Sequence, residues 1–247
     1  MRDNRKDKKE KEDSFVSSVE LERKMIGFYD YTVILTYLSP LSAVGGMALA
    51  MTGHPIWATM CLLFCGLCDM FDGKVARTKK NRTAEEKSFG IQIDSLSDVI
   101  AFGVLPAVIV LTLCRGCWYA YAVAPLYVLA GLIRLAYYNV TEEQRTQETD
   151  EVRKDYSGLP ITSAALIFPI FYCATAVYCI CKNGVILPYK DMFAGSLFGI
   201  GLCVLTALVG LCFILPFKIR KPRAKELWLF FAIGVLIAAV LLLALFR

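Results

Sequence analysis

Long apolar stretches alternate with short polar ones along almost the whole chain after residue 25. Crossing the hydrocarbon core of a bilayer takes a helix of roughly 20 mostly apolar residues, and the stretches have about this length. We therefore predict an all-α polytopic membrane helix bundle, with six core transmembrane helices and a seventh at the C-terminal end. The seven predicted segments are residues 29–52, 56–73, 94–114, 118–139, 159–181, 192–216 and 226–246.

Basic residues are distributed unevenly over the polar connections. Three connections are rich in them: Lys74, Arg77, Lys79, Lys80, Arg82 and Lys87 after the second segment, Arg145, Arg153 and Lys154 after the fourth, and Lys218, Arg220, Lys221, Arg223 and Lys225 after the sixth. The opposite side has only Arg115, Lys182, Lys190 and Arg247. Because positively charged loops stay in the cytoplasm, the N-terminus and the three basic connections are predicted to be cytoplasmic.

Residues 1–24 differ from the rest of the chain. They contain eight Lys or Arg and seven Asp or Glu, without the apolar run that a cleavable signal peptide needs behind its basic start. This composition is typical of a solvated, partly disordered tail. The alternative is that residues 14–24 form an amphipathic helix on the membrane surface, so we expect either a charged cytoplasmic tail or an N-terminal interfacial helix here.

Composition agrees with a membrane protein, since 57% of the 247 residues are hydrophobic. Eight of the ten cysteines lie in or at the ends of apolar runs, where they behave as small apolar residues. One C-x-x-C pair, Cys114 and Cys117, has no second pair, and His54 is the single histidine, so a structural zinc site is not expected. Small residues at 42–46 and 195–201 favour close helix packing and suggest a homodimer face.

Four aspartates stand at the predicted cytoplasmic ends of the second and third segments. Asp69 and Asp72 are three residues apart, and Asp94 and Asp98 are four apart, so each pair lies on one helix face. A single acid at a helix end is usually a solvated or capping residue. Four acids on adjacent membrane helices repel one another and lose solvation, which normally marks a functional site. Carboxylate oxygens suit hard cations such as magnesium, manganese or calcium, so we predict a metal site.

The residues after these acids indicate what binds beside the metal. Gly73 and Ala76 are small, so a flat or bulky group can approach the helix closely. Arg77 adds a fixed positive charge for phosphate oxygens at the membrane boundary. Metal ions, an arginine and access for a lipid-soluble substrate together favour phosphoryl-group chemistry.

The pattern D-x-x-D-G-x-x-A-R followed by G-x-x-x-D-x-x-x-D resembles the signature of the CDP-alcohol phosphotransferases. The matching residues are Asp69, Asp72, Gly73, Ala76, Arg77, Gly90, Asp94 and Asp98. Twelve residues separate Arg77 from Gly90, more than the family usually has, so we expect a longer cytoplasmic loop and an intact site. Residues 93–106, 133–140 and 158–161 look like the phosphatidylserine synthase branch. The resemblance covers residues 25–217 as a membrane domain and leaves out 1–24 and 218–247.

The resemblance implies an activity: transfer of the phosphatidyl group from CDP-diacylglycerol to L-serine, with phosphatidylserine and CMP as products. Asp69, Asp72 and Asp94 would bind two divalent cations, Mg²⁺ or Mn²⁺, with Asp98 touching one of them and acting as general base. Gly73, Ala76 and Arg77 would hold the cytidine nucleotide, and Gly90 belongs to the same substrate-binding set. The implied partners are CDP-diacylglycerol, L-serine, the lipid bilayer and a second copy of the chain in a homodimer, with no nucleic acid.

Arg134 and Asn139 are further substrate-binding candidates. Arg134 lies near the cytoplasmic end of the fourth segment, where an isolated cation is costly, so it is expected to bind the serine carboxylate or a phosphate oxygen. The alternative is an arginine that snorkels to the interface on its long stem. The absence of an organelle-targeting signal favours a bacterial plasma membrane.

Other functions stay open on the sequence alone. The acceptor could be glycerol phosphate, inositol phosphate or choline, although phosphate-bearing acceptors call for more basic residues near the pocket than the apolar segments offer. A cation transporter is the alternative from another class. Transporters place such acids near the bilayer midplane, often on broken helices and in paired repeats, and this sequence shows neither feature.

Overall fold

The computed structural model describes residues 27–79, 81–148, 155–183, 192–193, 195–220 and 224–245. The described residues from Tyr31 onward form one compact unit. The predicted interfacial helix at residues 14–24 lies outside the described residues.

Helices make up most of this unit, as predicted. They are α2 (Ile34–Met51), α3 (Pro55–Ala76), α4 (Ala84–Asp98), the π-helix η1 (Val99–Val104), α5 (Leu105–Leu113), α6 (Trp118–Glu148), the short 3₁₀ helix η2 (Ile161–Ser163), α7 (Ala164–Asn183), α9 (Leu197–Ile214) and α10 (Ala224–Leu245). The described residues contain seven helical segments long and apolar enough to cross a membrane, one for each predicted span. The prediction of an all-α polytopic bundle is confirmed, and the protein is an integral membrane protein.

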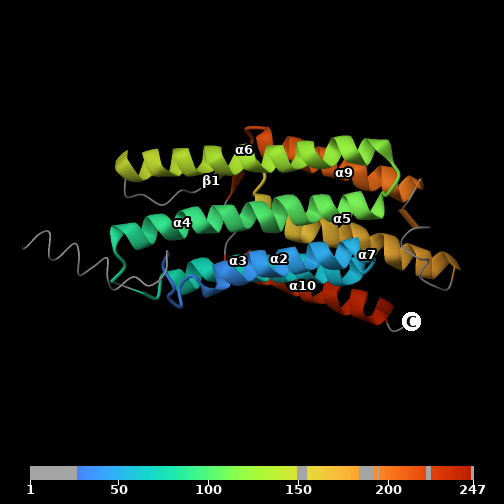
Figure 1. Ribbon diagram of the computed structural model, residues 1–247, viewed down its shortest axis with the longest axis horizontal. Coiled ribbons are helices and arrows are strands. Elements are labelled where there is room, and N and C mark those ends of the chain that lie inside the picture. The colour runs from blue at the N-terminus through green and yellow to red at the C-terminus, as the bar shows by residue number, and fades with distance from the viewer. Residues whose placement is uncertain are drawn as a thin grey trace, which may run out of the picture. The chain divides into compact units, whose positions relative to one another are not determined.

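The helices pack around the α4–η1–α5 rod, which appears in Figure 1 as one continuous run of green ribbon. Helix α2 packs along α3, α6 packs along α9, and α10 lies against α3 and α7. Small residues allow the closest approaches: a Cβ on Gly46 would lie 2.9 Å from the Cβ of Cys61. Gly46 therefore serves packing within the chain.

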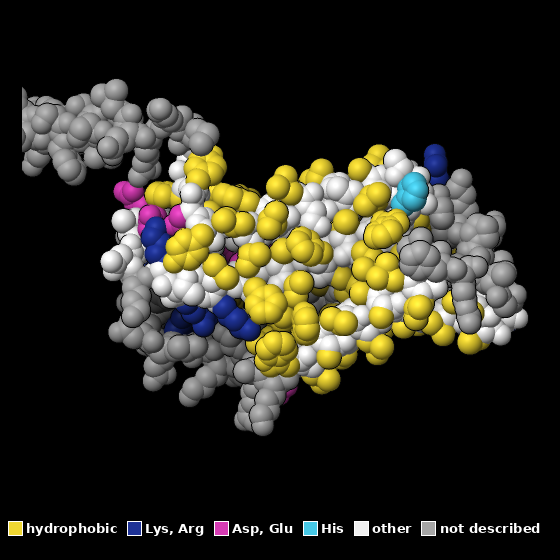
Figure 2. Space-filling view, turned by 90° about the horizontal axis from the view of Figure 1, so that it is seen from below, with side chains coloured by type: hydrophobic (Ala, Val, Ile, Leu, Met, Phe, Trp, Pro, Cys, Tyr) yellow, Lys and Arg dark blue, Asp and Glu magenta, His cyan; other side chains and the backbone are white. Residues whose placement is uncertain are grey.

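The surface of the bundle matches a membrane environment. Figure 2 shows hydrophobic side chains over the middle of the visible face, and most of the Lys, Arg, Asp and Glu side chains that can be seen on this face lie toward its left end. Helix α4 begins at that end in Figure 1. Helix α10 exposes several large apolar side chains, among them Trp228, Leu236 and Leu243, as expected for a helix that faces lipid.

Helix α4 begins ten residues before the predicted third segment. Thr83 caps it in a reciprocal capping box: the Glu86 backbone N–H donates to Thr83 Oγ1, and the Thr83 N–H donates to Glu86 Oε2, both at 3.1 Å. The predicted longer loop between Arg77 and Gly90 is therefore wrong. Only residues 77–83 connect the two helices, and the additional residues extend α4 by polar turns that hydropathy does not reveal.

In the π-helix directly after Asp98, one backbone hydrogen bond of a regular α-helix cannot form. Pro106 has no N–H to donate to the carbonyl four residues earlier, that of Phe102. The buried hydroxyl of Tyr127 on α6 donates to that carbonyl at 2.6 Å. The rings of Phe168 and Phe213 pack on Tyr127, with centroid separations of 5.6 Å and 5.4 Å. This hydrogen bond ties α6 to the rod that carries Asp94 and Asp98.

Tyr127→Phe is expected to destabilise the bundle by about 1–3 kcal/mol, because it leaves the buried Phe102 carbonyl without this donor while the ring contacts remain. The midpoint of thermal unfolding in detergent measures the effect. Tyr121→Phe, on an exposed position of the same helix, is the matched control. Equal midpoints for the two variants would show that the hydrogen bond contributes nothing.

A short two-stranded sheet was not predicted. Strand β1 (Asp155–Ser157) pairs antiparallel with β2 (Lys218–Arg220), with Tyr156 opposite Ile219. Gly158 follows with a φ of 75°, and a Cβ there would lie 3.1 Å from the Leu215 carbonyl oxygen. Glycine is needed here for both its left-handed backbone and this close approach. The pair fastens the chain before α7 to the chain after α9.

Candidate active site

Three of the four predicted aspartates meet between α3 and α4. Each of Asp69, Asp94 and Asp98 offers a carboxylate oxygen, and these three oxygens lie within 4.8 Å of one another. Asp69 comes from α3, and Asp94 and Asp98 come from successive turns of α4. The fold thus brings together side chains that are up to 29 positions apart in the sequence.

Asp72 lies at the edge of this group. It is not one of the three close carboxylates, but it lies near enough to Asp94 for their charges to interact. Asp72 and Asp98 are each only 9% exposed, so water screens their charges poorly. Grouped carboxylates with little solvent repel one another, and a bound divalent cation relieves that repulsion. The all-oxygen donor set fits a hard cation such as Mg²⁺ or Mn²⁺.

Helix α2 holds the two acid-bearing helices in place. The buried Ser97 side chain, next to Asp98, donates to the Thr36 carbonyl of α2 at 3.1 Å. On the other side, the thiol of Cys65 in α3 donates to the Ser39 carbonyl of the same helix at 3.2 Å. Both α3 and α4 are therefore anchored to one turn of α2, and this fixes the position of their acids relative to each other.

Helix α6 supplies two further polar side chains near the cluster. Arg134 is 7% exposed, so its side chain lies inside the bundle, and its guanidinium interacts electrostatically with the Asp98 carboxylate. The snorkelling alternative does not fit a side chain buried to this extent. Asn139 exchanges hydrogen bonds with Ser95 of α4, donating from Nδ2 to the hydroxyl at 2.8 Å and accepting from it at Oδ1 at 3.1 Å. The described contacts of Asn139 thus tie α6 to α4.

The side of α3 beyond Asp72 is open. A Cβ on Gly73 would meet no atom within 4 Å, and Gly73 itself is exposed. Ala76 ends α3, and the exposed Arg77 is its C-cap residue. A ligand can therefore reach the helix at Gly73 with a cation close by.

Gly90 has a neighbour that the sequence did not reveal. The Nη2 atom of Arg82 lies 2.7 Å from the position that a Gly90 Cβ would take. In the sequence, Arg82 is one of six basic residues around a loop and is counted only toward membrane orientation. Nothing in its spacing from Gly90 indicates the contact, because the turn at residues 77–83 creates it.

A family model described as CDP-alcohol phosphatidyltransferase matches residues 32–200, which include all the residues of the signature. This match covers well over half of the chain. The protein therefore belongs to the CDP-alcohol phosphatidyltransferase family.

Relatives with curated names support a narrower grouping. A CDP-diacylglycerol–serine O-phosphatidyltransferase of Saccharomyces cerevisiae is 34% identical over 150 residues, 58% of this chain and 53% of the relative. An archaetidylserine synthase of Methanothermobacter thermautotrophicus is 34% identical over 152 residues, 61% of each chain. A CDP-diacylglycerol–serine O-phosphatidyltransferase of Methanocaldococcus jannaschii is 26% identical over 219 residues, 88% of this chain and 86% of the relative. The first two alignments span less than two thirds of the relatives' own length.

Proposed function

We propose that the protein transfers the phosphatidyl group of CDP-diacylglycerol to the hydroxyl of L-serine, giving phosphatidylserine and CMP. The observation that carries the proposal is the meeting of Asp69, Asp94 and Asp98, on two helices that bear the family signature. The names of the relatives support serine as the acceptor. The name of the Methanothermobacter relative leaves the lipid part of the donor open.

In this proposal, Asp69, Asp72 and Asp94 hold two divalent cations, Mg²⁺ or Mn²⁺, and Asp98 contacts one of them. Bound there, the ions supply Lewis-acid neutralisation of the diphosphate and of the departing CMP. The donor set supports this assignment, since all four side chains offer carboxylate oxygens and Asp72 and Asp98 are largely buried.

Asp98 acts as the general base. The serine oxygen attacks the phosphorus that carries the diacylglycerol, its proton passes to the Asp98 carboxylate, and the bond from that phosphorus to the CMP oxygen breaks. Gly73, Ala76 and Arg77 receive the cytidine nucleotide on the open side of α3.

Arg134 is proposed to bind the carboxylate of serine, and its interaction with Asp98 supports this role because it puts the base next to the acceptor. Arg134→Gln is expected to raise the serine KM by roughly tenfold or more, the effect of losing a charge-assisted hydrogen bond, with a smaller change in the lipid KM. Arg145→Gln on the same helix, which breaks a surface pair with Glu142, is the matched control. If neither KM changes in the Arg134 variant, the role is wrong.

The acceptor is tested with a panel. Purified protein in mixed micelles receives CDP-diacylglycerol, Mg²⁺ or Mn²⁺, and one of four acceptors: L-serine, glycerol phosphate, inositol phosphate or choline. We expect L-serine to raise CMP release above the acceptor-free rate and the other three acceptors to leave it unchanged. Release with another acceptor and none with serine would refute serine as the substrate. Cation flux into proteoliposomes without CMP release under any condition would favour the transporter alternative.

We infer that the start of α4 faces the cytoplasm of a bacterial plasma membrane and that the protein works as a homodimer. The charged end of the bundle in Figure 2 supports the orientation through the positive-inside rule. Gly45 on an exposed face of α2, where a Cβ would meet no atom within 4 Å, is compatible with a close helix contact between two copies. The mass of the detergent-solubilised protein by light scattering tests the dimer.

A further inference from the structure

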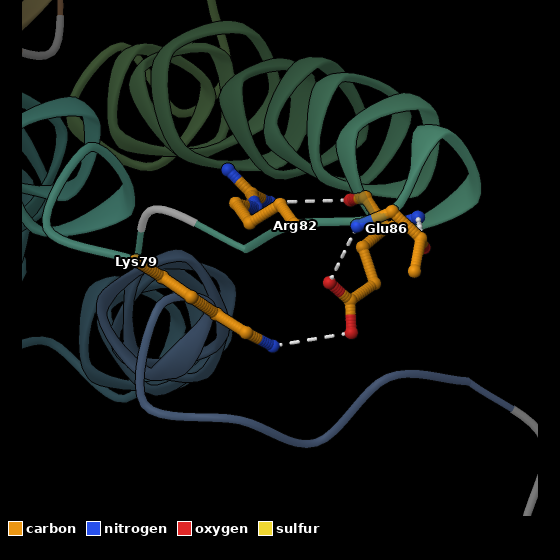
Figure 3. A network of polar contacts seen from close by, with 4 residues as sticks. Lys79, Arg82 and Glu86 are labelled. Atoms are coloured by element: carbon orange, nitrogen blue, oxygen red, sulfur yellow. Dashed lines mark hydrogen bonds and ion pairs between the residues drawn. The ribbon is translucent and has the colours of Figure 1, made fainter.

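We propose that Arg82 is an additional substrate-binding residue, which binds the phosphate oxygens of the CDP-linked lipid over Gly90. The proposal rests on the proposed function and adds a residue to its binding site. Figure 3 shows the network around it: Arg82 Nη2 donates to the Glu86 backbone carbonyl at 3.1 Å, and Lys79 Nζ pairs with Glu86 Oε1 at 3.1 Å. The capping box between Thr83 and Glu86 completes the network.

The position of Arg82 connects it to the acid cluster. Its Nη2 lies 2.7 Å from where a Gly90 Cβ would be. Gly90, Asp94 and Asp98 follow one another at intervals of four residues, so they lie along one face of α4. One interval is about 6 Å along the helix axis. The guanidinium is therefore one turn from the Asp94 end of the cluster, within the span of a diphosphate.

Among the described residues, the charge of Arg82 has no carboxylate counterpart. Its Nε atom is buried and has no hydrogen-bond partner within the part of the chain that the structure describes. Among the same residues no carboxylate pairs with its guanidinium, whereas the neighbouring Lys79 is paired with Glu86. A buried donor with an uncompensated positive charge favours an anionic ligand.

The chemistry of the guanidinium selects phosphate as that ligand. A planar fork of N–H donors matches two phosphate oxygens at once, and the Nη2 bond to Glu86 holds the fork in place before the ligand arrives. The serine carboxylate is the alternative anion. Its proposed partner, Arg134, lies beside Asp98, one further turn along α4 from Asp94, so the cytoplasmic end at Gly90 is left for the nucleotide phosphates.

The contact gives Gly90 a second reason to be glycine. A methyl group there would displace the tip of the Arg82 side chain, which is flexible enough to move. Gly90→Ala should therefore weaken phosphate binding through Arg82. If so, the Gly90 and Arg82 substitutions act on one interaction, and their effects do not add.

The test is binding of CDP, with Mn²⁺ present, to the full-length protein in detergent, measured by isothermal titration calorimetry. Arg82→Gln is expected to weaken CDP binding roughly tenfold or more, and Gly90→Ala by a smaller factor. The double variant should bind CDP no more weakly than Arg82→Gln does. Lys87 is an exposed cation on α4, so Lys87→Gln is the matched control and should bind CDP like the wild type. Unchanged unfolding midpoints verify that the variants are folded.

Three results would overturn the proposal. Equal CDP affinity in wild type and Arg82→Gln means that Arg82 binds no phosphate. A rise in serine KM at unchanged CDP affinity assigns the residue to the carboxylate instead. Factors that multiply in the double variant mean that Gly90 does not act through Arg82. Because CDP binding requires no acceptor, failure of the wild type to make phosphatidylserine would refute the proposed function and still leave this test decisive.

Discussion

Asp98→Asn is expected to slow phosphatidylserine formation by about a hundred- to ten-thousandfold, the usual contribution of a positioned general base. Asparagine keeps the size of the side chain and can still offer one oxygen to a cation, but it cannot accept the serine proton. The loss should therefore fall on kcat. The metal concentration at half-maximal rate should change by a few-fold at most, because the other three aspartates remain.

Two comparisons make the Asp98 result specific. Glu143→Gln, an exposed acid on α6, should retain wild-type kcat and control for a general effect of removing a carboxylate. If excess Mn²⁺ restores the Asp98→Asn rate to that of the wild type, Asp98 is only a metal ligand and the assigned base is wrong.

Removal of divalent cations is expected to reduce CMP release by about a thousandfold, the rate equivalent of several kcal/mol of charge stabilisation at the diphosphate. The carboxylates of Asp69, Asp94 and Asp98 would then face each other and the substrate phosphates without a neutralising charge. Treatment with EDTA, followed by gel filtration and a CMP assay, measures the effect.

Readdition distinguishes metal loss from damage to the protein. Mg²⁺ or Mn²⁺ should restore the rate, and Asp94→Asn should require a higher concentration of either ion for half-maximal rate. Undiminished CMP release after complete chelation would contradict the assignment of the cluster as a catalytic metal site.

The sequence was most informative where local spacing determines the outcome. Hydropathy located all seven membrane-spanning helices, because a helix surrounded by lipid needs apolar residues over its whole length. The spacing of Asp94 and Asp98 placed them on one face of a helix, and helix pairing brought Asp69 to them. The signature that the sequence shares with the CDP-alcohol phosphotransferases contains the same three aspartates.

Features that leave no mark in the hydropathy profile were missed. The pairing of Tyr156 with Ile219 joins positions 63 residues apart through strands of three residues each, too short to give a pattern. The polar turns at the start of α4 resemble a loop in a hydropathy profile, although the capping box at Thr83 was legible as T-x-x-E. The approach of Arg82 to Gly90 follows from that turn and from no periodicity.

The most direct test of the proposed reaction measures both products in one reaction. Purified protein in CDP-diacylglycerol micelles receives Mg²⁺ or Mn²⁺ and labelled L-serine, and CMP and labelled lipid are followed together. We expect equal molar amounts of CMP and phosphatidylserine, with both lost in Asp98→Asn. CMP released without labelled lipid, or neither product from the folded wild-type protein, would contradict phosphatidyl transfer to serine.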